Sequence, residues 1–177
     1  MQKGPFPLLL RLWVCNKQGL SRLHFAFGRR KKGSRMKLIY PLTGKVSVTS
    51  YFGSRTDPIT GQQGAFHPGI DFVSDVRTIV APCDMTPVYR FFERYNPNER
   101  YDLTKESAAG KYMVAIVPGT EYALRFLHCD EIFFHSEPIV RKGEPIGIYG
   151  STGYATGPHL HFETMLKWQH VDPNQFF

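Results

Sequence analysis

The most informative stretch of this 177-residue chain reads Gly157-Pro158-His159-Leu160-His161-Phe162-Glu163. Successive side chains of a strand point to opposite faces, so His159 and His161 share one face if the stretch is extended. Leu160 and Phe162 would then point into the core. Two imidazoles directed at one cleft suit a metal centre, in which one ring binds the ion and its neighbour handles protons. Because surface His-x-His pairs also arise by chance, the motif alone leaves a metal centre and a solvated strand both open.

A second motif, His67-Pro68-Gly69-Ile70-Asp71, favours the metal centre. Pro68-Gly69 disfavours a helix, so we expect a turn that delivers His67 and a strand start that delivers Asp71. With one imidazole of the pair they make three protein ligands. Three ligands and a fourth position for water are typical of catalytic zinc, whereas structural zinc sites are closed by four ligands. Taken alone, His67 would be a turn cap and Asp71 a solvated acid.

Further motifs occur around these two. In the first half of the chain they are Val46-Ser47-Val48-Thr49-Ser50-Tyr51-Phe52-Gly53-Ser54-Arg55 and Pro58-Ile59-Thr60-Gly61. In the second half they are residues 140–153 and Thr156-Gly157-Pro158, which lead into the histidine pair. Together these motifs, within residues 38–177, resemble the lysostaphin/LytM-type zinc metalloendopeptidases of bacterial cell walls. The resemblance implies the duplicated hybrid motif fold, an all-β, mostly antiparallel core with an open substrate groove.

The resemblance also assigns roles to single residues. It implies one Zn²⁺ per chain, held by His67, Asp71 and His161. Two further histidines, His159 and His128, are implied to be catalytic without binding the ion. We expect His128 at the end of a strand.

The assignment of His128 rests on Phe126-Leu127-His128, where the family usually has Tyr-Ala-His. The alternative, His135, lacks the strand-end context and is interpreted as a partly exposed loop histidine. Glu163 directly follows the ligand strand, and we interpret it as a supporting residue rather than a catalytic acid.

The implied reaction is hydrolysis of peptide bonds in the stems or cross-bridges of peptidoglycan. Zinc lowers the pKa of a bound water toward neutrality, which gives a hydroxide that attacks the peptide carbonyl. His128 and His159 can take the proton of this water, hydrogen-bond the developing oxyanion or protonate the leaving amine. The sequence has no His-Glu-x-x-His motif, so the base is not a glutamate on a ligand helix.

The basic charge of the chain is confined to its first residues. The formal net charge is +7, from 22 Lys/Arg and 15 Asp/Glu. Residues 1–35 contain nine of the basic residues and no acidic one, which leaves 13 basic and 15 acidic residues in the remainder. The remainder is therefore close to neutral, and no basic face or helix-turn-helix pattern supports nucleic-acid binding. The length suits one domain with a real core.

Residues 1–35 are expected to be a basic, disordered or processed leader, and residues 36–177 the zinc metalloendopeptidase domain. The apolar stretch 5–14 is too short to span a membrane, and Arg11 interrupts it. Val14 before Cys15 is too bulky for a lipoprotein cleavage site, so the export signal is not convincing. We expect no integral membrane segment and a monomer that acts outside the cytoplasm on the cell wall, as a secreted or bacteriophage-associated protein.

Short alternating segments separated by Gly, Pro and Asn predict strands. The predicted strands span residues 46–52, 70–73, 87–92, 112–117, 122–127 and 145–149. Residues 118–120 suit a hairpin connection, residues 93–110 and 150–158 suit loops, and residues 104–109 carry a weak helical pattern. Met85 occupies a position at which the family has a glycine. The turn around residues 81–85 is therefore expected to differ from the turn in the family.

Two other functions remain possible from the residues. A non-catalytic relative would bind cell wall or activate an amidase, but such proteins typically lose ligands that are all present here. A cysteine hydrolase would pair Cys129 with His128. Adjacent strand residues face opposite ways, so we expect Cys129 to point away from the histidines. The odd number of cysteines, three, argues against a disulfide framework.

Overall fold

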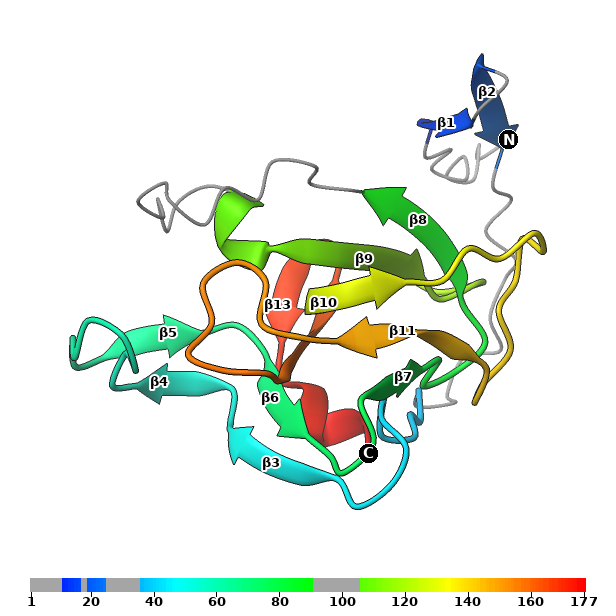
Figure 1. Cartoon of the computed structure of the whole chain (residues 1–177). Helices are drawn as coiled ribbons and strands as arrows, with labels where there is room; N and C mark the ends of the chain where they lie inside the picture. The colour runs from blue at the N-terminus through cyan, green and yellow to red at the C-terminus, as the bar shows by residue number, and fades with distance from the viewer. Residues whose placement is uncertain (1–10, 17–18, 25–35, 91–105) are drawn as a thin grey trace, which may run out of the picture.

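The computed structural model describes residues 11–16, 19–24, 36–90 and 106–177. Within these residues the regular structure is almost entirely β-strand (Figure 1), and the strands pair in antiparallel fashion. The expected all-β, mostly antiparallel fold is therefore confirmed.

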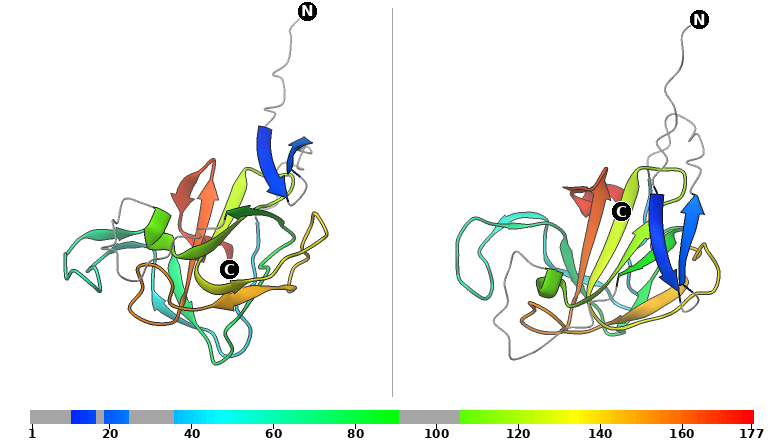
Figure 2. Two further views of the ribbon diagram at one scale, coloured as in Figure 1. Left: turned by 45° about the horizontal axis from the view of Figure 1, so that its top comes forward. Right: turned by 90° about the horizontal axis from the view of Figure 1, so that it is seen from above.

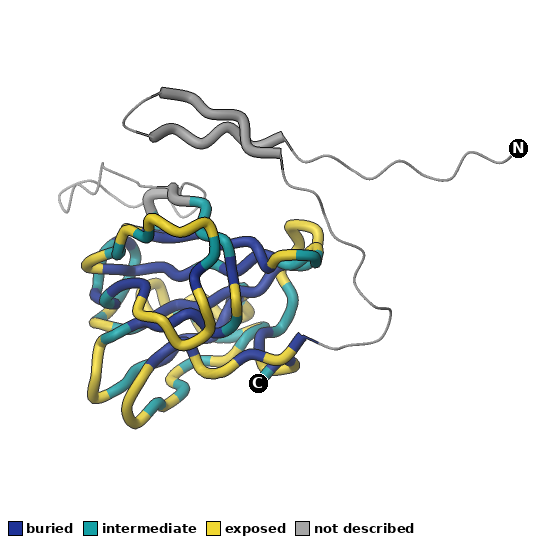
Figure 3. Tube along the Cα trace, turned by 90° about the vertical axis from the view of Figure 1, so that its right-hand side faces the viewer, coloured by how far each residue is buried: buried dark blue, intermediate teal, exposed yellow. Residues whose placement is uncertain are grey.

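A nine-stranded sheet forms the body of the protein. Its main path runs β3-β6-β12-β10-β11-β7, with β13 paired to β12 and with β9 and β8 extending from β10. The strands are β3 Ser47–Ser50, β6 Ile70–Val73, β7 Thr78–Val80, β8 Thr86–Arg90, β9 Lys111–Ile116, β10 Tyr122–Ile132, β11 Pro145–Tyr149, β12 Leu160–Leu166 and β13 Gln169–Val171. Buried residues run in stretches through the body of the domain, and exposed residues gather in loops at its surface (Figure 3). The buried residues lie mainly in β6, β9, β10, β11 and β12.

The alternation along β12 matches the expectation from the sequence. Leu160 and Phe162 are completely buried and belong to the main core. The Phe162 ring packs against the rings of Phe126 and Phe72, with centroids 5.2 and 6.5 Å away. Aromatic side chains bury about 150–250 Å² each, so these three rings contribute a large share of the apolar burial. The opposite face of the strand is left for His161.

Residues that follow position 35 are packed into the same core. Met36, Leu38 and Leu42 are buried. The backbone N–H of Leu38 donates to the carbonyl of Phe176, 2.7 Å away, in the short 3₁₀ helix η2 (Pro173–Phe176). This contact joins the first described residues of the domain to its last.

Two short hairpins lie outside the large sheet. β4 (Gly53–Arg55) and β5 (Ala65–His67) form one of them, and it projects from the side of the sheet (Figures 1 and 2). β1 (Arg11–Asn16) and β2 (Gly19–His24) form the other, within the stretch expected to be a leader. Residues 1–10, 17–18 and 25–35 lie outside the described residues, so a disordered or processed leader stays a prediction.

The predicted strands largely agree with the structure. β6 and β11 have the predicted bounds, and the connection at residues 118–120 joins β9 to β10 as expected. The weak helical pattern corresponds to the 3₁₀ helix η1 (Glu106–Ala109). Residues 93–105 of the predicted loop and residues 91–92 of the predicted strand 87–92 lie outside the described residues. Met85 is buried and pairs with Val140 through an isolated bridge. The short strands β4, β5, β7 and β13 were not predicted, because three residues are too few to establish an alternation. The strands β1 and β2 were not predicted either, since they lie in the stretch expected to be a leader.

Candidate metal centre

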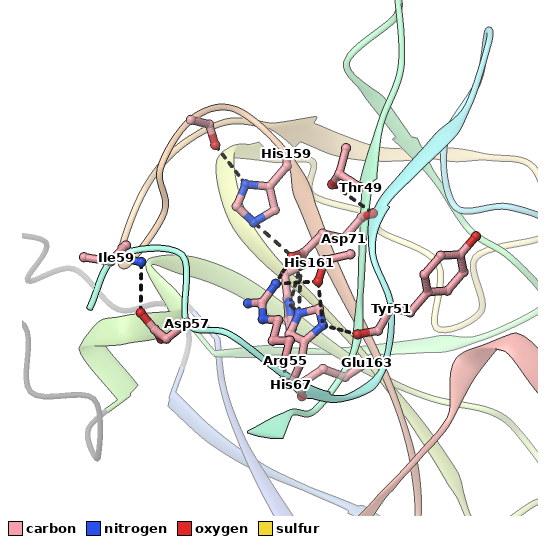
Figure 4. Close-up of polar contacts among 12 residues, drawn as sticks. Thr49, Tyr51, Arg55, Asp57, Ile59, His67, Asp71, His159, His161 and Glu163 are labelled. Atoms are coloured by element: carbon pink, nitrogen blue, oxygen red, sulfur yellow. Dashed lines mark hydrogen bonds and ion pairs between the residues drawn. The ribbon is translucent and has the colours of Figure 1, made fainter. Parts of the chain in front are cut away.

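Three side chains converge from three strands. His67 is the last residue of β5, rather than part of a turn as expected, while Asp71 lies in β6 and His161 lies opposite it in β12. Nε2 of His67 is 3.1 Å from Oδ1 of Asp71 and 2.9 Å from Nδ1 of His161, and that Nδ1 is 2.8 Å from the same Oδ1 (Figure 4). All three residues are buried. The structure thus brings together the three residues expected to bind the metal.

Gly69 explains why the link between His67 and Asp71 is so compact. A Cβ atom built at Gly69 would lie 2.4 Å from the carbonyl oxygen of Phe162 and 2.8 Å from Nε2 of His161. Any larger residue would push the link away from β12. Glycine is therefore needed here for close approach of two backbones, and this approach sets the distance between the two histidines.

The hydrogen-bond partners of the two rings indicate their tautomers. Nδ1 of His67 is 2.7 Å from the carbonyl oxygen of Tyr51, which can only accept, so this nitrogen carries the proton and Nε2 presents a lone pair. Nε2 of His161 lies 3.2 Å from Oε1 of Glu163, so the proton on that side leaves Nδ1 as an acceptor. Two nitrogen lone pairs and a carboxylate oxygen thus point at one place.

This donor set fits a zinc ion. A tetrahedral zinc site with bonds of 2.0–2.1 Å has neighbouring ligand atoms about 3.3 Å apart. The three atoms here are separated by 2.8 to 3.1 Å. Three acceptors repel one another at this distance unless a cation or a proton lies between them. A histidine ligand that donates its other ring N–H to a carboxylate is also characteristic of zinc sites.

Charged neighbours determine the ionisation of the cluster. Burial disfavours the charged form of Asp71, but close contact with the imidazoles of His161 and His67 outweighs burial and holds the pKa of Asp71 well below its usual range. Burial of Glu163 is likewise outweighed by His161, His170 and Arg125, so its pKa is also well below the usual range. Burial lowers the pKa of His161, yet Asp71 and Glu163 together raise it above the ordinary value. Both carboxylates are therefore ionised.

The outer oxygen of each carboxylate is bound by an arginine. Nη1 of Arg55 donates to Oδ2 of Asp71 at 2.9 Å, and Nη1 of Arg125 donates to Oε2 of Glu163 at 2.8 Å. His170 also contacts Oε2 of Glu163, at 3.1 Å. These three residues were not singled out in the sequence. Arg55 belongs to one of the quoted motifs, but the sequence carries no signal that pairs it with Asp71.

His159 and His128 lie beside the cluster with a shared arrangement. Nδ1 of His159 donates to the carbonyl of Gly157 at 2.8 Å, and Nε2 faces the cluster 3.6 Å from Oδ1 of Asp71. Nδ1 of His128 donates to the carbonyl of Thr152 at 2.8 Å. The ring centroids of His128 and His159 are 4.8 Å apart, and the centroid of the His128 ring is 5.9 Å from that of His161. In both His159 and His128 the hydrogen bond at Nδ1 leaves Nε2 as an acceptor.

His128 lies within β10 rather than at its end, but the strand is irregular there. Its φ angle is +62°, and the pairing of β10 with β9 shifts register between Phe126 and Cys129. Burial, followed by the charges of His161 and His159, lowers the pKa of His128 to about 3. The imidazole is therefore neutral at ordinary pH.

The rival residues lie elsewhere. Cys129 is buried in the main core, as expected, and burial raises the pKa of its thiol to about 12. A thiol with this pKa is a poor nucleophile, which disfavours the cysteine hydrolase. His135 lines a different hollow of about 630 Å³, formed by residues 134–139, 141 and 144–145. None of the clustered histidines lines that hollow.

A pocket of about 340 Å³ lies against the cluster, and Asp71 and His159 form part of its lining. Its two walls come from the loop between β4 and β5 and from residues 154–158. The hydroxyl of Tyr154 donates to Oδ1 of Asp57 at 3.2 Å, which joins the two walls. Although the hollow around His135 is larger, the pocket beside the histidines is the one that places a substrate next to reactive groups.

Comparison with known families agrees with this geometry. A model of peptidase family M23 matches residues 65–173, more than half of the chain and the whole histidine cluster. The chain belongs to peptidase family M23. The resemblance to the lysostaphin-type enzymes is thereby confirmed.

Individual relatives of this M23 domain are peptidases by name. It is 33% identical over 126 residues to the peptidoglycan DD-endopeptidase ShyB of Vibrio cholerae, which covers 71% of this chain and 26% of the relative. A zinc-containing peptidase from Vibrio cholerae has a similar structure, with a TM-score of 0.58 and 30% identity over 78% of this chain and 39% of that one. The catalytic domain of lysostaphin from Staphylococcus simulans has a TM-score of 0.56 and 25% identity, over 75% and 91% of the two chains.

This M23 domain spans about a quarter to a third of the length of the curated relatives it matches. Among the described residues, no helix combines the length and the apolar character needed to cross a membrane.

Proposed function

We propose that this M23 domain is a zinc-dependent endopeptidase that hydrolyses peptide bonds in the stems or cross-bridges of bacterial peptidoglycan. The observation that carries the proposal is the convergence of Nε2 of His67, Oδ1 of Asp71 and Nδ1 of His161, with two acceptor imidazoles beside them. The similarity to ShyB, named as a peptidoglycan endopeptidase, supports the choice of substrate.

His67, Asp71 and His161 would hold the ion. When bound, zinc supplies Lewis acid chemistry, because it polarises a carbonyl and lowers the pKa of a water. Arg55 keeps Oδ2 of Asp71 occupied so that Oδ1 is directed at the ion, and Glu163 does the same for the ring of His161. The outer contacts thus fix which atom of each ligand faces the cluster.

His128 and His159 would move protons. Each keeps its own proton on Nδ1, where a backbone carbonyl accepts it, and each leaves Nε2 as an acceptor. His159 lines the pocket itself, and the ring of His128 lies behind it with its centroid 4.8 Å from that of His159. As water adds to the peptide carbon, one Nε2 takes its proton. The imidazolium then returns that proton to the nitrogen of the breaking C–N bond, so the products are a free carboxylate and a free amine. The other ring can stabilise the negative oxygen when it is protonated, because the imidazolium carries a second N–H at Nε2.

The pocket would receive the peptide beside these groups. Its lining includes Thr49 and Val73 as well as residues 154–158, together with Asp71 and His159. An endopeptidase needs room for the chain on both sides of the cleaved bond, and in this proposal the hollow between the two loops provides it. We place this activity in the cell wall, outside the cytoplasm, with the domain acting as a monomer.

The test is digestion of purified peptidoglycan by the full chain, followed by mass spectrometry of the released fragments. We expect fragments with new amino and carboxyl termini, abolition of cleavage by a chelator and recovery on addition of Zn²⁺. Peptidoglycans with different cross-bridges would identify the bond that is cut. Binding to peptidoglycan without release of any fragment, by zinc-loaded protein, would overturn the proposal and favour a non-catalytic wall-binding domain.

A further inference from the structure

Thr152 lies where three segments of the chain meet. It belongs to the loop of residues 150–158 that leads into β12, and it contacts both the irregular part of β10 and the start of β9. Its carbonyl accepts the hydrogen bond from Nδ1 of His128. Thr152 is therefore the residue that determines where the proton of His128 is held.

The hydroxyl of Thr152 makes two hydrogen bonds of its own. It donates to the carbonyl of Cys129 at 2.9 Å and accepts from the backbone N–H of Lys111 at 3.0 Å. In addition, the N–H of Gly150 donates to the carbonyl of His128 at 2.8 Å. The loop is thus hydrogen-bonded to residues 128 and 129, on both sides of the peptide bond that follows His128, so the carbonyl that binds the imidazole is held rigidly relative to the ring.

Two glycines bring this loop against the segment before β9. Gly110 and Gly153 have φ angles of +66° and +76°, which other residues rarely adopt. A Cβ atom at Gly153 would lie 2.3 Å from the nitrogen of Gly110, and one at Gly110 would lie 2.4 Å from the carbonyl of Thr152. The N–H of Tyr154 also donates to the carbonyl of Ala108 at 2.9 Å. Residues 108–110 therefore pack closely against the backbone of residues 152–154 and hold Thr152 in place.

We propose that Thr152 is a positioning residue that fixes the tautomer and the orientation of His128. This inference rests on the proposed function, in which Nε2 of His128 must be an acceptor that faces the substrate. His128 has an unusual backbone conformation in a bulged strand, so its ring direction is not set by regular strand geometry. The hydrogen bond to the Thr152 carbonyl fixes the direction of the ring instead. Its own position depends on the hydroxyl and on residues 108–111.

The test compares Thr152→Val, which keeps the branched shape without the hydroxyl, with Thr152→Ser, which keeps the hydroxyl. Ser151→Ala in the same loop is the matched control, since no hydrogen bond of its side chain is seen in the described structure. We expect T152V to lower kcat roughly 10- to 100-fold, as for a displacement of about 1 Å in a catalytic group. KM and zinc affinity should change less than about twofold, T152S should restore most of kcat, and S151A should match the wild-type chain.

A direct readout is the ¹⁵N spectrum of the imidazoles in the zinc-loaded full chain, with the His128 signals assigned by their loss in His128→Asn. In the wild-type chain we expect a proton on Nδ1 and none on Nε2. In T152V the two tautomers should be mixed. A single wild-type tautomer together with wild-type kcat in T152V would overturn the proposal. If T152V does not fold, Thr152→Ala is judged by the same two measurements.

The two proposals can fail separately. If the wild-type chain cleaves no peptidoglycan, the proposed function fails, and the spectra of T152V still decide whether Thr152 fixes His128. If the wild-type chain is active and T152V leaves both the tautomer and kcat unchanged, only the role of Thr152 is wrong.

Discussion

The proposed zinc ligands and the proposed catalytic histidines are held by different kinds of backbone. Asp71 and His161 are paired directly across β6 and β12, and His67 ends β5, so regular strand geometry sets the distances between the ligands. His128 has a positive φ angle in a bulged strand, and His159 immediately precedes β12. Regular pairing suits atoms that must keep fixed separations. Irregular backbone lets two further rings reach the same point from the side.

Among the proposed ligands, the substitution His161→Ala should have the largest effect. The three ligands form the ligand half of the site, and His128 and His159 form the other half. We expect loss of bound zinc and a fall in peptidase activity on the order of 10⁴ or more, because the ion is proposed to supply several kcal/mol of barrier lowering. Metal content by mass spectrometry and fragment release from peptidoglycan measure both effects. His135→Ala, in the other hollow, is the control and should retain both. A zinc-loaded, active H161A protein would remove His161 from the ligand set.

His159→Asn and His128→Asn test the other half. Each should lower kcat by about 10²- to 10⁴-fold, the usual contribution of a general acid or base, while zinc remains bound at one ion per chain. Steady-state kinetics on a soluble peptidoglycan fragment and metal analysis of the same samples give the comparison. If either substitution released the zinc, that histidine would belong with the ligands and the division into two halves would be wrong.

Glu163→Gln should have an intermediate effect. The substitution keeps the shape but removes the charge that orients His161, so we expect zinc affinity to fall about 10- to 100-fold. Competition with a chromophoric chelator measures the affinity. Glu121→Gln, in an exposed ion pair with Lys167, is the matched control and should leave the affinity unchanged. Equal affinity in E163Q and the wild-type chain would show that the carboxylate does not support the ligand.

The smallest effect is expected from thiol alkylation. The pKa of Cys83 is raised to about 11 by burial and then by Asp84, and that of Cys129 is raised to about 12. Both thiols are therefore protonated and unreactive at neutral pH. Treatment with iodoacetamide at pH 7.5 should leave Cys83 and Cys129 unmodified by peptide mass spectrometry and should leave activity unchanged. Loss of activity in parallel with alkylation of Cys129 would support the alternative in which the protein is a cysteine hydrolase.

Much of the ligand half could be predicted from the sequence. Alternation along Leu160, His161 and Phe162 was enough to assign faces, since two of the three are apolar and lie in the core. The interruption of His67 and Asp71 by Pro68-Gly69 excluded a helix. These inferences depend on side-chain types, which the sequence displays.

The backbone groups that orient the imidazoles could not be predicted from the sequence. The carbonyls of Tyr51, Gly157 and Thr152 fix three imidazoles, and a carbonyl is present at every residue, so no residue type marks it. The positive φ angle of His128 likewise follows from the bulge in β10 and not from a glycine or asparagine at that position. Tertiary contacts decided these features.

The pairing of each carboxylate with an arginine affects the charge balance of the centre. Asp71 is neutralised by Arg55, and Glu163 by Arg125, so with neutral imidazoles the centre has a formal charge of about zero before any ion enters. A divalent cation would then keep its full charge excess instead of being compensated by its ligands. An electropositive pocket of this kind favours anionic oxygen, the species that forms when a peptide carbonyl is attacked.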